Sequence, residues 1–311
     1  MSKLVLANLA AAGAASIAGA SVVATRLVVG ETDPVTLSFY RYLVAALCLV
    51  PVLPLLWPRS RIPAADLVRI ALLGALFFGF FPWAFSASLQ YTTAARGAIG
   101  LATIPIQTLV IAALFGREAL SRRKLLSVAL AFAGIAIVFG PAAYAGRDSS
   151  YLAGDGLMLL GAFSAALYSV FSRSVLGRHG PLFVTALAMA FGVLSLSPLL
   201  LAGGTATALP PLSRDGWLGL LFLGTFGGAI QFSLFTWALR WLPPSRAVIY
   251  LALSPVSAML LAVLLLGEAV TVLLVAGLAA VIAAILVANL PRLALRAGVA
   301  APGAGVVQRQ P

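Results

Sequence analysis

The sequence predicts an all-α membrane protein in which ten transmembrane helices form two five-helix inverted repeats around a central cavity. The chain of 311 residues is 62% hydrophobic and 9% charged, whereas a soluble domain carries about 25% charged residues. The chain also repeats itself, because residues 91–119 match residues 241–269 at a constant offset of 150. A repeat of half the chain length is typical of secondary transporters.

The repeat is clearest in its charged residues and prolines. The matched pairs are Arg96 and Arg246, Pro105 and Pro255, and Glu118 and Glu268. A second stretch repeats at an offset of 147 and pairs Pro34 with Pro181. We therefore divide the chain into a first repeat over 1–146 and a second repeat over 147–291. The segment 292–311 is expected to be a disordered cytoplasmic tail.

Each predicted span is an apolar run of about 20 residues, the length needed to cross a bilayer. Breakers separate the runs, as at Asp33-Pro34 and Gly180-Pro181. The first run resembles a signal peptide, but its repeat partner is internal, so it is interpreted as a retained span. The ten spans are predicted at 4–27, 34–57, 66–90, 97–116, 122–142, 152–175, 181–202, 215–241, 245–266 and 270–290.

Lys and Arg fall unevenly on the two sides of these spans. The side that holds both termini carries 15 of them, and the other side carries four, namely Arg26, Arg96, Arg147 and Arg214. Because positively charged loops stay in the cytoplasm, both termini are predicted to be cytoplasmic in a multi-pass protein of the inner membrane. With five spans per repeat, the second repeat is then upside down relative to the first.

The composition argues against several other classes. The net charge of +12 lies in short loops rather than in a basic stripe with aromatic residues, so no nucleic-acid partner is expected. The chain has one cysteine, Cys48, and one histidine, His179, which form no metal or catalytic set. We therefore expect no cofactor, no metal and no enzyme activity, since a membrane enzyme needs a nucleophile with a base or a metal cluster.

Short motifs near the end of each repeat resemble a known family. Gly116-Arg117-Glu118 follows Pro105, and Gly267-Glu268 follows Pro255; glycines in the next spans and Arg41 early in the second span complete the pattern. This arrangement is similar to the drug/metabolite transporter superfamily, in particular its EamA-type permeases with ten helices. The resemblance implies transport of small metabolites, often export. In length and aromatic content the chain is similar to the YddG-type aromatic amino acid exporters.

Polar and aromatic residues recur at helical spacing on spans 1, 3, 4, 6, 8 and 9, which predicts that these spans surround the cavity. The alternative is that their hydroxyl groups bond their own helix or join helices together. The predicted substrate-binding residues are Phe78, Phe81, Trp83, Ser86, Thr103, Gln107, Ser164, Tyr168, Gln231, Trp237, Tyr250, Ser254 and Ser257.

The prolines and acidic residues receive mechanical roles. Pro105 and Pro255 interrupt their helices and are predicted to act as symmetric hinges. Glu118 and Glu268 are expected to cap the next helix, and the alternative is proton coupling.

The arginines near the spans are the candidates for charge recognition. Arg96 and Arg246 are candidate contacts for a substrate carboxylate, and the alternative is that they extend to the membrane interface. Arg41 is given a structural role, in which it either pairs with a loop carboxylate such as Glu31 or Asp33 or extends to the membrane interface.

No acidic residue is expected in the middle of a span, which favours a zwitterionic or neutral amphipathic substrate over a cation. The predicted function is secondary transport by alternating access, most simply export of aromatic or apolar amino acids by a monomer. The alternatives are export of other small organic metabolites or lipophilic drugs, or a different class of activity, a membrane-embedded enzyme or a channel.

Overall fold

The computed structural model describes residues 3–52, 61–117, 121–144, 149–203, 209–238, 241–242, 250 and 253–289. Every regular element in these ranges is a helix, which confirms the all-helical class for them. In the described part of the chain, six helical segments are long and apolar enough to cross a membrane: Lys3–Val28, Ala64–Tyr91, Ala94–Leu114, Tyr151–Phe171, Pro181–Ala202 and Arg214–Phe235. Three shorter apolar helices are Pro34–Leu49, Leu253–Leu266 and Val272–Val287.

The elements of the first half are α1 (Lys3–Val28), α2 (Pro34–Leu49), the 3-10 turn η1 (Val50–Val52), α4 (Ala64–Gly74), the π-helical segment η2 (Ala75–Phe80), α5 (Phe81–Tyr91), α6 (Ala94–Leu101), α7 (Ile104–Leu114) and α8 (Arg122–Tyr144). Those of the second half are α9 (Ser149–Phe171), α10 (Arg173–His179), α11 (Pro181–Ala202), α12 (Arg214–Gly224), the π-helical segment η3 (Thr225–Ile230), α13 (Gln231–Ala238), α15 (Leu253–Leu266) and α16 (Val272–Asn289).

Side-chain caps and glycines set the helix ends. Asp33 accepts hydrogen bonds from the backbone N–H groups of Val35 and Thr36, both at 2.9 Å, and so starts α2. Gly116 and Gly267 end α7 and α15 with positive φ angles of 65° and 63°. Glycine adopts this left-handed conformation without the steric cost of a Cβ atom, so the two helices stop in the same way.

The span predicted at 97–116 is divided into α6 and α7. The interruption falls at residues 102–103, directly before Pro105. Proline has no N–H to donate to the carbonyl four residues earlier, and its ring crowds that turn. The sequence therefore predicted this bend point.

The two π-helical segments occupy equivalent positions in the repeat. η2 begins at Ala75 and η3 begins at Thr225, again at an offset of 150. Pro82 follows η2, whereas Phe232 stands at the equivalent position after η3, so proline is not their common cause. Both segments directly follow a glycine, Gly74 or Gly224. Segments of this kind are frequent at functional sites.

Those two glycines make equivalent close contacts. A methyl group at Gly74 would overlap the carbonyl oxygen of Ala188 in α11, and one at Gly224 would lie 3.0 Å from the carbonyl oxygen of Arg41 in α2. Ala188 and Arg41 are themselves related by the offset of 147. Small residues let membrane helices approach closely, and here they do so in pairs related by the repeat.

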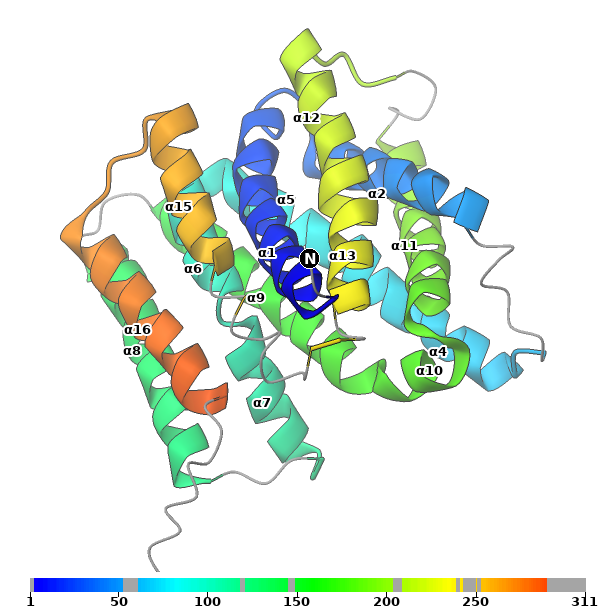
Figure 1. Cartoon of the computed structure of the whole chain (residues 1–311). Helices are drawn as coiled ribbons and strands as arrows, with labels where there is room; N and C mark the ends of the chain where they lie inside the picture. The colour runs from blue at the N-terminus through cyan, green and yellow to red at the C-terminus, as the bar shows by residue number, and fades with distance from the viewer. Residues whose placement is uncertain are drawn as a thin grey trace, which may run out of the picture.

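The helix contacts follow the same relation. Figure 1 shows α8 paired with α16 at one side of the bundle, and α2 with α11 at the other. α1 packs on α12, α13 and α15, while α9 packs on η2, α5, α6 and α7. α2 contacts α12 and η3, and α11 contacts α4 and η2. Exchanging the two halves of the chain turns the contact of α1 with α13 into that of α9 with α5, and the contact of α1 with α15 into that of α9 with α7. The contacts of α2 with α12 and η3 likewise correspond to those of α11 with α4 and η2.

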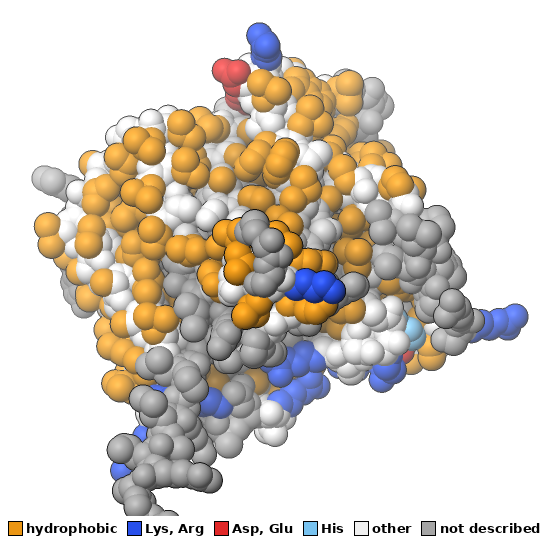
Figure 2. Space-filling view, viewed as in Figure 1, with side chains coloured by type: hydrophobic (Ala, Val, Ile, Leu, Met, Phe, Trp, Pro, Cys, Tyr) orange, Lys and Arg blue, Asp and Glu red, His pale blue; other side chains and the backbone are white. Residues whose placement is uncertain are grey.

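Apolar side chains face outward. Leu72, Leu114 and Leu264 are each at least 68% exposed. Figure 2 shows apolar side chains over the middle of one face, while most of the visible Lys and Arg side chains lie in the lower half of the view. Such a surface suits a bilayer, where helices satisfy their own backbone groups and present apolar side chains to lipid.

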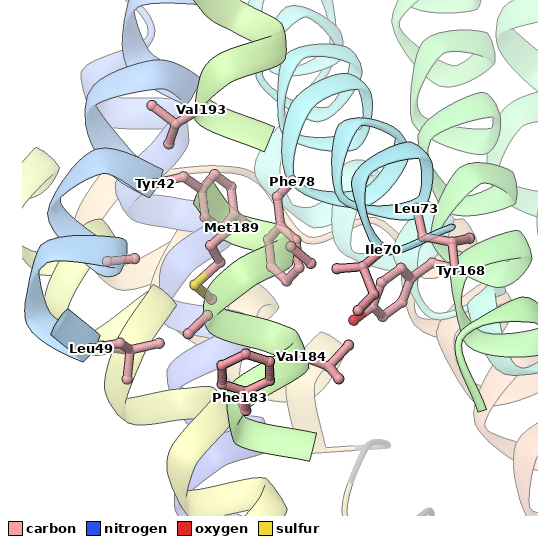
Figure 3. Packing of buried hydrophobic residues seen from close by; sticks show 14 of the residues in the cluster. Tyr42, Leu49, Ile70, Leu73, Phe78, Tyr168, Phe183, Val184, Met189 and Val193 are labelled. Atoms are coloured by element: carbon pink, nitrogen blue, oxygen red, sulfur yellow. The ribbon is translucent and has the colours of Figure 1, made fainter. Parts of the chain in front are cut away.

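A buried aromatic cluster joins α2, η2, α9 and α11 (Figure 3). The ring of Phe78 is fully buried and meets Tyr42 and Tyr168 edge to face, at 5.2 and 5.9 Å between ring centroids. Each such pair contributes about 0.5–1.5 kcal/mol beyond the burial of area. This packing fixes α2 against η2.

Candidate functional site

A cavity of about 340 Å³ lies between the two halves of the chain. Its volume is that of roughly ten water molecules in the liquid and falls within the usual range for small-molecule pockets. Its wall comes from α1, α2, η2, α5, α6 and α7 of the first half and from α9, η3, α13, α15 and α16 of the second. The cavity thus touches the six spans predicted to line it and, in addition, α2 and α16.

Phenylalanine side chains form an apolar wall. Phe77, Phe81 and Phe85 recur every four residues along η2 and α5, so they lie on one face. Their rings stack with 5.4 and 5.9 Å between successive centroids. Phe232 and Phe235 of α13 also line the cavity. This wall suits an aromatic or branched apolar group.

Arg41 brings a positive charge to the cavity wall. It is 7% exposed and lies about 10 Å along α2 from its first residue, Pro34. Its Nη1 donates a long hydrogen bond of 3.4 Å to Oγ1 of Thr25, and its buried Nε has no partner. No carboxylate among the described residues forms an ion pair with it. A guanidinium has five N–H donors, so most of this capacity is unused.

The two acidic residues named as possible partners of Arg41 form their hydrogen bonds with other residues. Glu31 accepts hydrogen bonds from N and Oγ of Ser213 at 2.7 and 2.8 Å, just before α12. Asp33 is engaged at the start of α2. The repeat equivalent of Arg41 is Ala188, which is buried. A position-by-position comparison of the repeats would have marked Arg41 as a charge that breaks the symmetry.

Besides Arg41, five of the residues singled out in the sequence line the cavity, namely Phe81, Pro105, Gln231, Ser254 and Pro255. Gln231 and Ser254 bring an amide and a hydroxyl group from the second half. Pro105 and Pro255 occupy equivalent positions on its wall. The cavity therefore has an aromatic wall with a small number of polar groups.

Three other predicted residues on the third span have different surroundings. Phe78 belongs to the buried cluster of Figure 3. The ring of Trp83 packs on Phe80 at 5.6 Å between centroids, and Ser86 is buried within α5. The helical spacing identified the correct span, but these side chains contact neighbouring helices or their own helix.

The hydroxyl groups of the fourth and sixth spans bond their own helices. Thr103 donates to the carbonyl of Gly100 at 2.6 Å and accepts from Nε2 of Gln107 at 2.9 Å. Ser164 donates to the carbonyl of Gly161 at 2.7 Å. For these side chains, the alternative named above, local bonding within the helix, describes the structure.

The remaining predicted residues hold helices together. Tyr168 stacks on Phe77 with 4.4 Å between ring centroids. Ser257 of α15 lies 3.4 Å from the carbonyl of Ser16 in α1, to which it donates, and it also donates within its own helix to the carbonyl of Ser254 at 3.0 Å. Trp237 and Tyr250 pack beside α1. The Tyr250 hydroxyl donates to Oδ1 of Asn8 in α1 at 2.9 Å.

A partly buried arginine, Arg96, forms an ion pair with the buried Asp155 of α9. Its Nη1 also donates to the carbonyl of Val138 at 2.7 Å, and Thr92 donates to Oδ1 of Asp155 at 3.1 Å. We call Thr92, Arg96 and Asp155 the Arg96 cluster. A carboxylate of the protein already occupies the guanidinium that was predicted to meet a substrate. Its repeat partner, Arg246, lies outside the described residues.

Glu268 connects the two halves. Its carboxylate oxygens accept hydrogen bonds from the backbone N–H groups of Ala94 and Ala95 at 2.7 and 3.0 Å. Glu268 therefore caps a helix start, but the helix is α6 of the other half and not the next helix, as had been expected. The equivalent residue, Glu118, lies outside the described residues.

Metal-ligand and nucleophilic residues are scattered. Among the described residues, no group of three or more His, Cys, Asp or Glu side chains is placed to hold a metal ion. Cys48 is exposed on α2, and Nε2 of His179 lies 2.7 Å from Asp66 near the end of α10. The cavity wall and the Arg96 cluster thus contain the polar groups most relevant to function.

The chain is similar to transporters over most of its length. Residues 5–140 and 152–290 each match the EamA-like transporter family. The "uncharacterized inner membrane transporter YedA" of Escherichia coli K12 is 30% identical over 253 residues, which cover 80% of this chain and 79% of that protein. An "uncharacterized transporter" of Archaeoglobus fulgidus is 26% identical over 247 residues, covering 79% and 84%.

Another relative has a named substrate, and a crystal structure shares the fold. The "Probable terminal-alkyne amino-acid exporter" of Streptantibioticus cattleyicolor is 28% identical over 246 residues, which cover 79% of this chain and 80% of that protein. The crystal structure matches with a TM-score of 0.62 and covers 91% of this chain and 96% of its own. At 20% identity, that match bears on the fold alone.

Proposed function

The chain belongs to the EamA-like transporter family and is a multi-pass membrane transporter, and on this premise we propose that it exports amino acids with aromatic or other apolar side chains. The observation that carries the proposal is a cavity between the halves that combines a phenylalanine wall with the positive charge of Arg41. An amino acid with an apolar side chain offers a matching apolar group and a carboxylate. The amino-acid exporter of S. cattleyicolor supports both the substrate class and the direction.

The transport mechanism proposed here is alternating access by two inverted five-helix repeats, 1–146 and 147–291, in a monomer with ten spans. Support comes from the paired contacts of Gly74 with Ala188 and Gly224 with Arg41, and from the equivalent π-helical segments. A cavity at the interface of two related halves can open to either side by rocking one half against the other.

Pro105 and Pro255 are proposed as the symmetric hinges of this motion. Both line the cavity, and Pro105 directly follows the interruption between α6 and α7. Replacement of each proline by alanine should restore a backbone donor and slow exchange. Unchanged flux in both variants would contradict the hinge assignment.

Transport can be tested in proteoliposomes that hold purified protein and an excess of unlabelled L-phenylalanine. Labelled L-phenylalanine added outside should accumulate by exchange, and it should not accumulate in protein-free liposomes. L-Tryptophan and L-leucine should compete, whereas L-lysine, a nucleoside and glucose should not. Failure of every amino acid to exchange would overturn the proposed function.

Membrane orientation is proposed from the charge asymmetry, with both termini in the cytoplasm of a cell whose inner membrane holds the protein. Cys48→Ser provides a background for single cysteines at Arg123 or Arg214. An impermeant thiol reagent should label position 214 in intact cells and position 123 only after lysis. The opposite pattern would overturn the orientation.

A further inference from the structure

Arg41 is a buried cation without an acidic partner among the described residues, and it lines the cavity. We propose that Arg41 is the carboxylate receptor of the transport site and that the site takes monocarboxylates with an aromatic or apolar body, with or without an α-ammonium group. This inference rests on the proposed transport function and specifies the substrate class of the same site.

The burial of Arg41 is the first step of the argument. A buried charge is costly unless another charge and hydrogen bonds compensate it. Arg41 has one long bond to Thr25, its Cζ lies 5.4 Å from the centroid of the Tyr42 ring, and its Nε has no hydrogen-bond partner. No described carboxylate compensates its charge. A carboxylate is the complementary group, since a guanidinium can bind its two oxygens in parallel.

The second step is space beside the guanidinium. A Cβ atom built on Gly227 of η3 would lie 3.5 Å from Nη2 of Arg41 and would overlap Oγ of Ser21. Gly227 and Ser21 both line the cavity. The absent side chain at Gly227 therefore keeps the guanidinium uncovered on the side of the second half.

The number of positive charges on the cavity wall limits the charge of the anion that can bind. Arg41 is the one charged side chain among the described residues that line the cavity. One positive charge neutralises a monocarboxylate, whereas a phosphate monoester would leave an uncompensated negative charge in an apolar site.

The described residues that line the cavity also limit how much the amino group of a substrate can add to its affinity. The described lining residues include no carboxylate to pair with an ammonium ion, which finds hydroxyl and amide oxygens such as those of Ser254 and Gln231. The ammonium group meets no opposite charge among these residues, so it lacks the ion–ion attraction that the carboxylate gains at Arg41. An α-ammonium group should therefore add less to affinity than the carboxylate does.

The repeat gives the bound molecule a direction. The position equivalent to Arg41 is the uncharged Ala188, so the cavity has one positive pole, on α2. The carboxylate lies at this pole, and the apolar body extends toward Phe81 and Phe85 of α5.

Binding to the purified full-length protein tests this inference by calorimetry with matched probes. 3-Phenylpropanoate and L-phenylalanine should bind, with affinities within about tenfold of each other. 3-Phenylpropanamide should bind about 10- to 100-fold more weakly, as the loss of a charge-assisted hydrogen bond requires. 2-Phenylethylamine and phenyl phosphate should bind more weakly than 3-phenylpropanoate.

Variants test whether Arg41 is the residue that distinguishes a carboxylate from an amide. Arg41→Gln should reduce the ratio of carboxylate to amide affinity to near one, and Arg41→Lys should keep part of it. Arg69→Gln removes a partly exposed arginine of α4 that does not line the cavity, and it should leave the ratio unchanged. If Arg41→Gln does not fold, the probe series on the unchanged protein still decides the substrate class.

The outcomes separate the two proposals. Equal binding of 3-phenylpropanoate and 3-phenylpropanamide, tighter binding of phenyl phosphate, or an unchanged ratio in Arg41→Gln would overturn the receptor role even if L-phenylalanine exchange persists. Absence of both binding and exchange for every carboxylate and amino acid would overturn the transport proposal and this inference together.

Discussion

Arg41 is a buried arginine and Arg96 a partly buried one, both in the first half, but their surroundings differ. The Arg96 side chain is 15% exposed and forms an ion pair with Asp155 within the Arg96 cluster. Arg41 lies on the cavity wall, and no carboxylate of the described chain pairs with it. The protein itself compensates the charge of Arg96, so this arginine joins helices. The charge of Arg41 remains available to a bound molecule.

The largest expected effect is the loss of stability that follows removal of the acidic partner of Arg96. Asp155→Asn leaves the partly buried Arg96 guanidinium without a counter-charge and should destabilise the protein by about 3–5 kcal/mol. Thermal unfolding in detergent should show a markedly lower midpoint. The double variant Arg96→Met/Asp155→Leu removes both charges and should recover much of this loss. If the unfolding midpoint of Asp155→Asn equals that of the unchanged protein, the pair has no structural role.

The second-largest expected effect is an increase in stability. Arg41→Met removes a buried cation that has no acidic partner among the described residues, and it should stabilise the substrate-free protein by about 1–3 kcal/mol while abolishing exchange. The same thermal measurement, without ligand, checks the stability. A destabilisation as large as that of Asp155→Asn would show that Arg41 is compensated within the protein, as Arg96 is.

A smaller loss of stability is expected where Glu268 of the second half caps α6 of the first half. Glu268→Gln keeps one amide oxygen but loses the charge that faces the start of α6, and it should cost about 1 kcal/mol. Asp215→Asn, an exposed acid in the first turn of α12, is the matched control and should change the midpoint less. Equal shifts for the two variants would mean that the bonds from Ala94 and Ala95 contribute no more than an exposed helix-end charge.

The smallest effect is expected at an exposed ion pair. The Arg178 side chain is 52% exposed, and its Nη2 lies 2.6 Å from Oδ1 of Asp66. Water and salt screen such a pair, so Arg178→Gln should leave both the midpoint and the exchange rate unchanged. A fall in the unfolding midpoint close to that of Asp155→Asn would contradict the expectation that less exposed ion pairs contribute more to stability.

The fold could be predicted from the sequence where local chemistry decides the structure. α2 starts at Pro34 and α11 starts at Pro181, as the breakers indicated. The interruption before Pro105 follows from its missing N–H group. The π-helical segments could not be predicted, because the residues after them, Pro82 and Phe232, differ in their backbone chemistry.

The site was predicted at the level of spans rather than side chains. Helical spacing identifies a face, but it does not distinguish a face on the cavity from one packed on another helix. Phe81 and Gln231 line the cavity, whereas Tyr168 packs on Phe77 and Thr103 bonds its own helix. Aromatic and hydroxyl groups serve packing as well as binding, so their type alone could not separate the two roles.

The partners of the two arginines could not be predicted for a related reason. Asp155 lies near the start of its predicted span, and its burial beside Arg96 depends on how α9 packs on α5 and α6. Glu31 was a candidate partner of Arg41 by sequence proximity, but the fold directs it to Ser213. Long-range packing, which a single sequence does not encode locally, decides which charge remains unpaired.

The most direct test of the central claim is an experimental structure of the protein with bound 3-phenylpropanoate. The account predicts carboxylate oxygens about 2.7–2.9 Å from the guanidinium nitrogens of Arg41, with the phenyl ring against Phe81 and Phe85. A carboxylate bound at the Arg96 cluster, or one that points away from Arg41 inside the cavity, would contradict it.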